Sequence, residues 1–131
     1  MKAGKKIFII DDDPIHRLLM SKLFERQPKS CNLSFFENGQ KGLTALETII
    51  AETPETLPEI ILLDIEMPFM NGWQFMDKYS ALPEDIKKQM RIYMVSSSFS
   101  DQDRERVKAY ADIQDYVVKP LRMEKIIELL D

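Results

Sequence analysis

The sequence predicts a single α/β domain, in which a parallel sheet carries helices on both faces. Short runs of β-branched and aliphatic residues alternate five times with longer amphipathic stretches. The 131 residues, 44% of them hydrophobic, suffice for one sizeable core, and no Gly/Ser-rich linker divides them. Strand followed by helix, repeated in this way, requires parallel strands covered on both sides.

Each predicted strand is a short apolar run with a charged or hydroxyl residue at its end. In chain order, the strands are expected at residues 5–11, 33–37, 59–64, 91–96 and 114–119. The stretches between them carry apolar residues at helical spacing and predict helices at residues 14–27, 40–52, 72–81, 101–111 and 122–130. Two polar, proline-bearing stretches, residues 51–59 and 82–89, are interpreted as loops inside the domain.

Charge and composition exclude several classes of protein. Eighteen basic and 22 acidic residues leave a net charge of -4, which predicts no cationic surface for nucleic acid or anionic lipid. Cys31 is the single cysteine, so an internal disulfide and a thiol zinc site are excluded, and a reducing cytoplasm is the expected location. Apolar runs fall far short of the roughly 20 residues of a membrane helix, and no signal peptide is recognisable.

Polar side chains stand at the carboxyl ends of the predicted strands, where open parallel sheets bind ligands. Asp11 and Asp12 follow the first strand, and Asp64, Ser96 and Lys119 end the third, fourth and fifth. If the first and third strands are neighbours, about 4.8 Å apart, three carboxylates crowd together and need a proton or a cation. Mg²⁺ suits such an oxygen site, and it also accepts phosphate oxygens.

The third acidic residue of the cluster has a simpler explanation. Asp13 precedes Pro14, so it is interpreted as a helix N-cap with proline at the first helical position. One helix start needs only one cap. Asp11 and Asp12 are therefore left as candidate metal ligands.

Four motifs together resemble a CheY-like receiver domain of two-component response regulators. They are the acidic pair at 11–12, "LLDIEMPFMNG" at 62–72, "MVSS" at 94–97 and "YVVKP" at 116–120. The resemblance covers essentially the whole chain. It implies a flavodoxin-like, doubly wound (βα)5 sandwich with strand order 2-1-3-4-5. It also implies one receiver domain over residues 1–131, apparently stand-alone and without an output domain, so its output is expected to pass through another protein.

The resemblance assigns roles in phosphoryl transfer. Asp64 matches the phosphoacceptor, which takes a phosphoryl group from a histidine kinase or a histidine phosphotransfer protein. Asp12 and Asp64 would bind Mg²⁺ or Mn²⁺ directly, Asp11 directly or through water, and the backbone carbonyl of Glu66 would complete the set. Lys119 would pair with a phosphoryl oxygen. A domain of this kind catalyses only its own phosphorylation and dephosphorylation and is otherwise not an enzyme.

The same resemblance implies a switch. Ser96 matches the switch hydroxyl and Tyr116 the switch aromatic, which report phosphorylation to a face formed by residues 101–130. The alternative for Tyr116 is an ordinary half-buried strand tyrosine. Glu66 and Ser98 flank the expected path of the hydrolytic water and would tune the lifetime of the adduct. Phe99 and Tyr116 are expected as apolar anchors for a protein effector, while the mixed charges of residues 101–112 offer no DNA-reading helix.

The first predicted helix carries apolar residues around too wide an arc for one buried face. One edge of this apolar arc is expected to pack against a neighbouring helix. The alternative, which the resemblance implies, is that it docks a kinase near Ile15, His16 and Leu19. Pro120 matches a cis proline. A role for His16 as a phosphohistidine is disfavoured, since the pattern is not a helical bundle.

Three other functional classes fit the sequence less well. A flavin mononucleotide carrier is disfavoured because the acidic cluster would repel the phosphate. A small aspartate-nucleophile phosphatase would use Asp64 and Glu66 but would need a cap or a substrate pocket. A receiver-like binding module that works without phosphorylation is disfavoured because every carboxylate, the hydroxyl and the lysine are present.

Overall fold

The computed structural model describes residues 4–98 and 100–131, in which five parallel strands form one sheet of order β2-β1-β3-β4-β5. The strands are β1 (Lys5–Ile10), β2 (Cys31–Phe36), β3 (Ile60–Asp64), β4 (Arg91–Ser96) and β5 (Ile113–Val118). The order reverses direction at β1 and β3, which places a crevice at the carboxyl ends of these two neighbours. The predicted fold class and strand order are confirmed.

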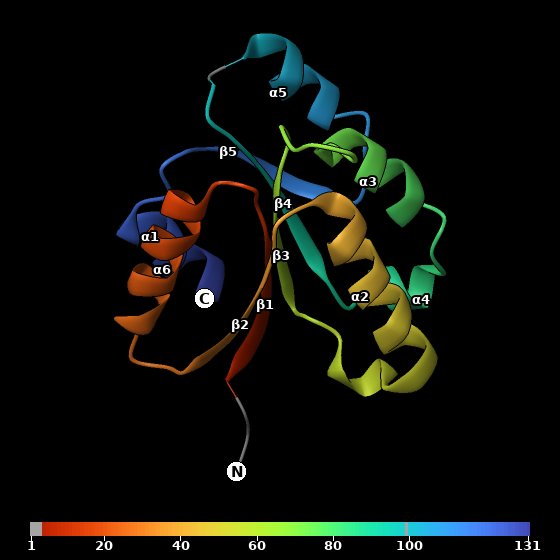
Figure 1. The fold of residues 1–131 in the computed structure, drawn as a ribbon, viewed down its shortest axis with the longest axis horizontal. Coiled ribbons are helices and arrows are strands. Elements are labelled where there is room, and N and C mark those ends of the chain that lie inside the picture. Colours follow the sequence, from red (N-terminus) through yellow and green to blue (C-terminus); the bar gives the residue numbers. More distant parts are fainter. Residues whose placement is uncertain (1–3, 99) are drawn as a thin grey trace.

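Helices cover both faces of this sheet (Figure 1). They are α1 (Pro14–Glu25), α2 (Gly39–Glu52), the 3₁₀ turn η1 (Pro54–Thr56), α3 (Gly72–Tyr79), α4 (Glu84–Lys87), α5 (Asp101–Val107) and α6 (Met123–Leu130). Helices α1 and α6 lie on one side, and α2 and α3 on the other, with α5 beyond α3. Within the described ranges, none of the helices is long and apolar enough to cross a membrane.

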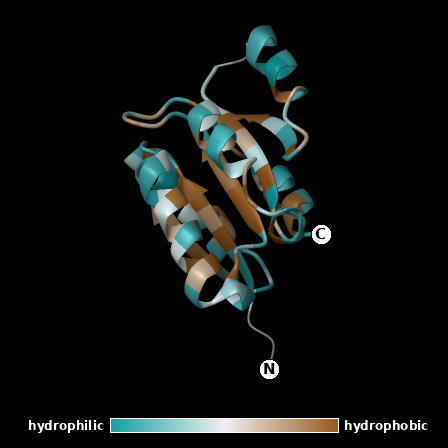
Figure 2. Cartoon of the chain, turned by 90° about the vertical axis from the view of Figure 1, so that its right-hand side faces the viewer, coloured by the Kyte–Doolittle hydropathy of each residue, from teal (hydrophilic) through white to brown (hydrophobic). Residues whose placement is uncertain are grey.

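Alternate residues of the central strands feed two separate cores. In β3, Ile60 and Leu62 pack with Met20 of α1 and Ile126 of α6, while the next residues along the strand face α2 and α3. Figure 2 shows the strands as predominantly hydrophobic between helices with hydrophilic outer surfaces. Because both faces of β1 and β3 are buried, these strands are continuous apolar runs rather than alternating ones.

The two stretches expected as loops contain short helical segments, so that expectation was wrong. Residues 84–87 form α4, where Glu84 and Asp85 occupy the first turn and favour the helix N-terminus electrostatically. The N–H of Lys88 closes the turn on the carbonyl of Glu84 at 3.0 Å. In the earlier stretch, η1 follows α2 directly and begins at Pro54.

Helix α5 is shorter than predicted and ends at Val107. Beyond that residue, the N–H groups of Lys108, Ala109 and Tyr110 bond to carbonyls three residues back, so the chain tightens into a turn. Strand β2 begins earlier than predicted, at Cys31, because it pairs with β1 from Lys5 onward.

Candidate functional site

Three carboxylates meet at the carboxyl edge of the sheet, as the strand-end pattern predicted. Asp11 and Asp12 follow β1, Asp64 ends β3, and the two strands are paired side by side. One oxygen from each residue lies within 4.8 Å of the others. Asp11 and Asp64 are buried, with 3% and 4% of their surface exposed, whereas Asp12 is exposed. Such a set of oxygens, open on one side, fits a hard divalent cation that retains water ligands.

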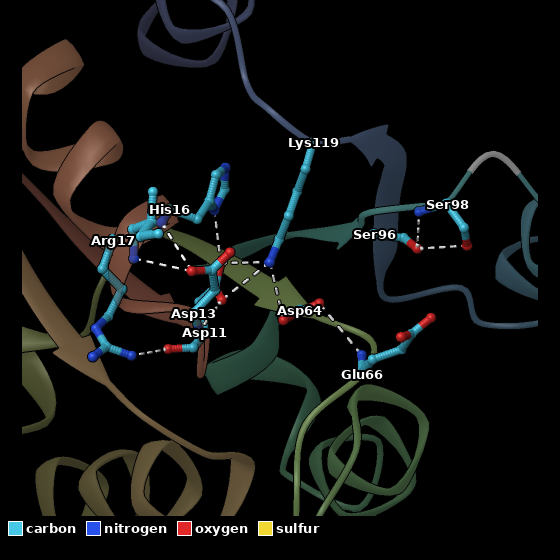
Figure 3. Close-up of polar contacts among 10 residues, drawn as sticks. Asp11, Asp13, His16, Arg17, Asp64, Glu66, Ser96, Ser98 and Lys119 are labelled. Carbon is cyan, nitrogen blue, oxygen red and sulfur yellow. Dashed lines mark hydrogen bonds and ion pairs between the residues drawn. The ribbon is translucent and has the colours of Figure 1, made fainter.

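Lys119 connects two of these carboxylates (Figure 3). Its Nζ lies 3.1 Å from each oxygen of Asp11 and 3.2 Å from Oδ2 of Asp64. The side chain follows the end of β5, and the backbone N–H of Lys119 donates a 2.7 Å hydrogen bond to the carbonyl of Ser96 at the end of β4. Lys119 thus reaches the carboxylates from β5, which lies on the side of β4 away from β3.

The two buried carboxyl groups have different acidities. Burial raises the pKa of Asp64 to about 7, and repulsion by Asp11 adds to this effect against the attraction of Lys119. Burial also disfavours the charge on Asp11, but hydrogen bonds from His16, from the Asp13 N–H and from Lys119 outweigh it and hold that pKa below its ordinary value. Without a cation, a proton bound by the pair therefore belongs to Asp64 rather than Asp11.

The start of α1 positions Asp11. Asp13 is the N-cap, as predicted, and its side chain accepts from the N–H groups of Ile15 and His16 at 2.9 and 3.3 Å. The N–H of Asp13 donates to Oδ1 of Asp11 at 2.8 Å, and Arg17 donates to the Asp11 carbonyl at 2.6 Å.

His16 also contacts Asp11, because its Nδ1 lies 2.7 Å from Oδ2. This contact was not predicted from the sequence. The available signal was the position of His16 in the first turn after the Asp13 cap, which brings its ring back over the strand end.

The predicted switch residues are linked through Ser98. Ser96 is fully buried, and its Oγ accepts from the N–H of Ser98 at 3.2 Å and lies 3.3 Å from the Ser98 hydroxyl. The Tyr116 hydroxyl donates to the Ser98 carbonyl at 2.7 Å, so the tyrosine ring is held in the buried position. The guanidinium carbon of Arg104 lies 5.2 Å from the centre of this ring. Phe99, the other expected anchor, lies outside the described residues.

The segment after β3 approaches Asp64 closely. The N–H of Glu66 donates to Oδ1 of Asp64 at 3.3 Å, and the Glu66 side chain is exposed and points away from Lys119 (Figure 3). A Cβ on Gly72 would lie 2.8 Å from the carbonyl oxygen of Asp64, so glycine is required here by close packing. Asn71 is the N-cap of α3, and no glycine in the described ranges has a positive φ, so Gly72 is needed for space and not for its backbone angle. The predicted cis bond before Pro120 is present.

A family model described as the response regulator receiver domain matches residues 7–131. The chain belongs to this family. It is 30% identical over 119 residues to a protein-glutamate methylesterase/protein-glutamine glutaminase from Treponema pallidum, which aligns with 90% of this chain. It is 28% identical over 125 residues to the nitrate/nitrite response regulator protein NarL from Escherichia coli, which aligns with 95% of this chain.

These relatives are longer than the receiver domain described here. The match spans 27% of the methylesterase and 52% of NarL. Among solved structures, the receiver domain resembles a two-component response regulator from Cytophaga hutchinsonii, with a TM-score of 0.87, 25% identity and coverage of 98% and 95% of the two chains. A response regulator receiver protein from Dyadobacter fermentans gives a TM-score of 0.82, 27% identity and coverage of 97% and 95%.

Proposed function

We propose that this receiver domain accepts a phosphoryl group on Asp64 from a phosphohistidine and thereby changes its binding to another protein. One observation carries the proposal. A buried Asp64 shares the Lys119 ammonium with Asp11, while the exposed Asp12 opens the same group of carboxylates to solvent. These contacts support Asp64 as the nucleophile, with one cation beside it and one open side for a donor.

Asp11, Asp12, Asp64 and the backbone carbonyl of Glu66 would hold Mg²⁺ or Mn²⁺. The donor set fits, because three carboxylates gather beside one ammonium group, which contacts only two of them. When bound, the cation would neutralise charge on the phosphoryl group and keep its transfer in line.

The chemistry of Asp64 follows from its surroundings. An oxygen of the ionised carboxylate attacks phosphorus, a P–O bond forms, and the P–N bond of the phosphohistidine breaks with its electron pair remaining on the imidazole nitrogen. Lys119 already contacts Asp64, so its ammonium group can move to an oxygen of the incoming phosphoryl group and pair with it. Ser96 ends β4, which lies two strands from β1 in the sheet. Its hydroxyl would donate a hydrogen bond to the same phosphoryl group. The exposed side chains of Glu66 and Ser98 would set the rate of hydrolysis.

The output would pass through Tyr116 to the face formed by α5, β5 and α6. If the Ser96 hydroxyl turns toward the phosphoryl group, its bond with the Ser98 N–H is lost, and Ser98 is the residue that holds the Tyr116 hydroxyl. The partners proposed are a histidine kinase or phosphotransfer protein and a downstream protein effector. A direct nucleic-acid partner is not proposed, since Asp101 and Asp103 open α5.

A membrane partner is not proposed. The proposed location is the cytoplasm, because the single thiol of Cys31 fits a reducing compartment.

Intact mass spectrometry after incubation with acetyl phosphate and Mg²⁺ tests the proposal. The wild type should gain one phosphoryl group, and hydroxylamine should remove it, as expected for an acyl phosphate. Asp64→Asn should gain none, whereas Asp85→Asn, which changes an exposed aspartate of α4, should behave as the wild type. An adduct that persists in Asp64→Asn would refute the assignment. Unaltered wild-type protein would instead favour a binding module that works without phosphorylation.

A further inference from the structure

His16 is a buried polar side chain with one strong contact. Only 6% of the residue is exposed, and its Nδ1 lies 2.7 Å from Oδ2 of Asp11. A carboxylate can only accept, so the proton of this bond resides on Nδ1. The ring therefore donates to the same carboxylate that Lys119 also contacts (Figure 3).

The other ring nitrogen is buried and unpaired. Nε2 of His16 has no hydrogen-bond partner within residues 4–98 and 100–131. A buried polar atom without a partner lowers stability, and an apolar side chain of similar size would avoid this cost. Packing therefore does not account for a histidine at this position. The feature that an apolar residue could not reproduce is the bond from Nδ1 to Asp11.

Three donors hold the Asp11 carboxylate, and they differ in rigidity. The N–H of Asp13 is fixed by the backbone at 2.8 Å from Oδ1, and the His16 ring is fixed by burial. The third donor is Lys119, whose long side chain also serves Asp64. If the Lys119 ammonium group leaves Asp11 to bond with a phosphoryl oxygen, His16 remains the only side-chain donor to Asp11 among the contacts described.

We propose that His16 is a positioning residue, which holds Oδ2 of Asp11 so that this carboxylate keeps its orientation toward the cation when Lys119 leaves. The inference rests on the proposed function and names a residue outside the proposed ligands of the cation and the phosphoryl group. Partners of ligating groups commonly change metal affinity by about 10–100-fold when they are removed.

Calorimetric titration with Mg²⁺ and thermal melts of wild type, His16→Leu and His16→Asn test the role. His16→Leu should lose about tenfold in Mg²⁺ affinity relative to His16→Asn, and the thermal melts check that both variants are folded. His16→Asn should retain affinity close to wild type, because its amide N–H occupies nearly the place of Nδ1–H. With beryllofluoride present to engage Lys119, the loss in His16→Leu should increase.

Two further measurements test the same role without depending on the folding of His16→Leu. His16→Gln carries the same amide one bond farther out, near the position of Nε2, and should bind Mg²⁺ more weakly than His16→Asn. Nitrogen-15 spectra of the wild type should show the imidazole proton on Nδ1 before any cation is added.

The contrary outcomes separate failure of the positioning role from failure of the proposed metal site. Equal Mg²⁺ affinity in wild type and His16→Leu, or in the Asn and Gln variants, would overturn the positioning role and leave the proposed function intact. A proton on Nε2 in place of Nδ1 would do the same. No Mg²⁺ binding by the wild type would overturn the metal site of the proposed function and this inference with it.

Discussion

The hydroxyl of Tyr116 donates a 2.7 Å hydrogen bond to the carbonyl of Ser98, across a separation of 18 residues in the sequence. The N–H of the same serine donates to the Ser96 hydroxyl. One residue of the segment after β4 thus connects the aromatic ring of β5 to the hydroxyl that ends β4. Any displacement of the Ser96 hydroxyl has a direct route to the tyrosine.

This link predicts how a phosphoryl mimic should act at a distance. Addition of beryllofluoride and Mg²⁺ should change amide chemical shifts at Asp64 and along residues 96–120. In Tyr116→Phe, the changes near Asp64 should persist while those at Ser98 and in β5 shrink, since the hydroxyl bond is absent. Tyr110→Phe removes a hydroxyl that bonds to Asp77 instead and is the matched control. Shift changes restricted to the acidic cluster would reject the switch.

Two adjacent aspartates should separate metal binding from stability. Asp12→Ala should abolish Mg²⁺ binding and leave the free energy of unfolding unchanged or raised, because one of several repelling carboxylates is gone. Asp13→Ala removes the N-cap of α1 and should lower that free energy by about 1 kcal/mol with little effect on Mg²⁺ affinity. Calorimetry and thermal melts of both variants measure the two effects. The reverse pattern would show that the ligands are assigned wrongly.

Stability should fall as the pH rises through the titration of Asp64. Its pKa is about 7 in the folded chain and about 3.9 when unfolded, so between these values the folded state binds more protons. Asp64→Asn should therefore raise the free energy of unfolding by on the order of 4 kcal/mol at pH 8 and hardly at all at pH 4. Denaturant unfolding across this range, without divalent cations, provides the measurement. An equal gain at both pH values would contradict the buried charge as the cause.

Gly72 should be intolerant of a side chain. A Cβ there would meet the Asp64 carbonyl oxygen at 2.8 Å and the Ile65 Cα at 2.9 Å, and both are backbone atoms. Gly72→Ala should cost about 1–3 kcal/mol of stability and weaken Mg²⁺ binding, since the end of β3 must shift. In Gly42→Ala the close neighbour is the tip of the Ile10 side chain, which can rotate, so the loss should be smaller. Urea unfolding and calorimetry would show whether the two variants differ.

The sheet and its edge were predictable because local patterns determine them. The apolar run before Asp64 is buried on both faces, and parallel strands bring their ends to one side, so Asp11, Asp64 and Lys119 could be grouped from sequence. The His16 contact depends on the orientation of one ring, and the bond from Tyr116 to Ser98 depends on the path of a loop. No periodic pattern encodes either of them. Helix α4 was missed because a four-residue helix is too short to show a period.

The position of Lys119 has a consequence during synthesis. It contacts Asp11 across 108 positions of the chain, and it directly follows β5, which pairs with β4. A nascent chain that ends before β5 lacks the ammonium group that the proposed phosphoryl transfer to Asp64 would use. If Asp64 is the phosphoacceptor, we expect such a chain to be a poor acceptor, and unfinished molecules would then compete little with completed ones for the phosphoryl group.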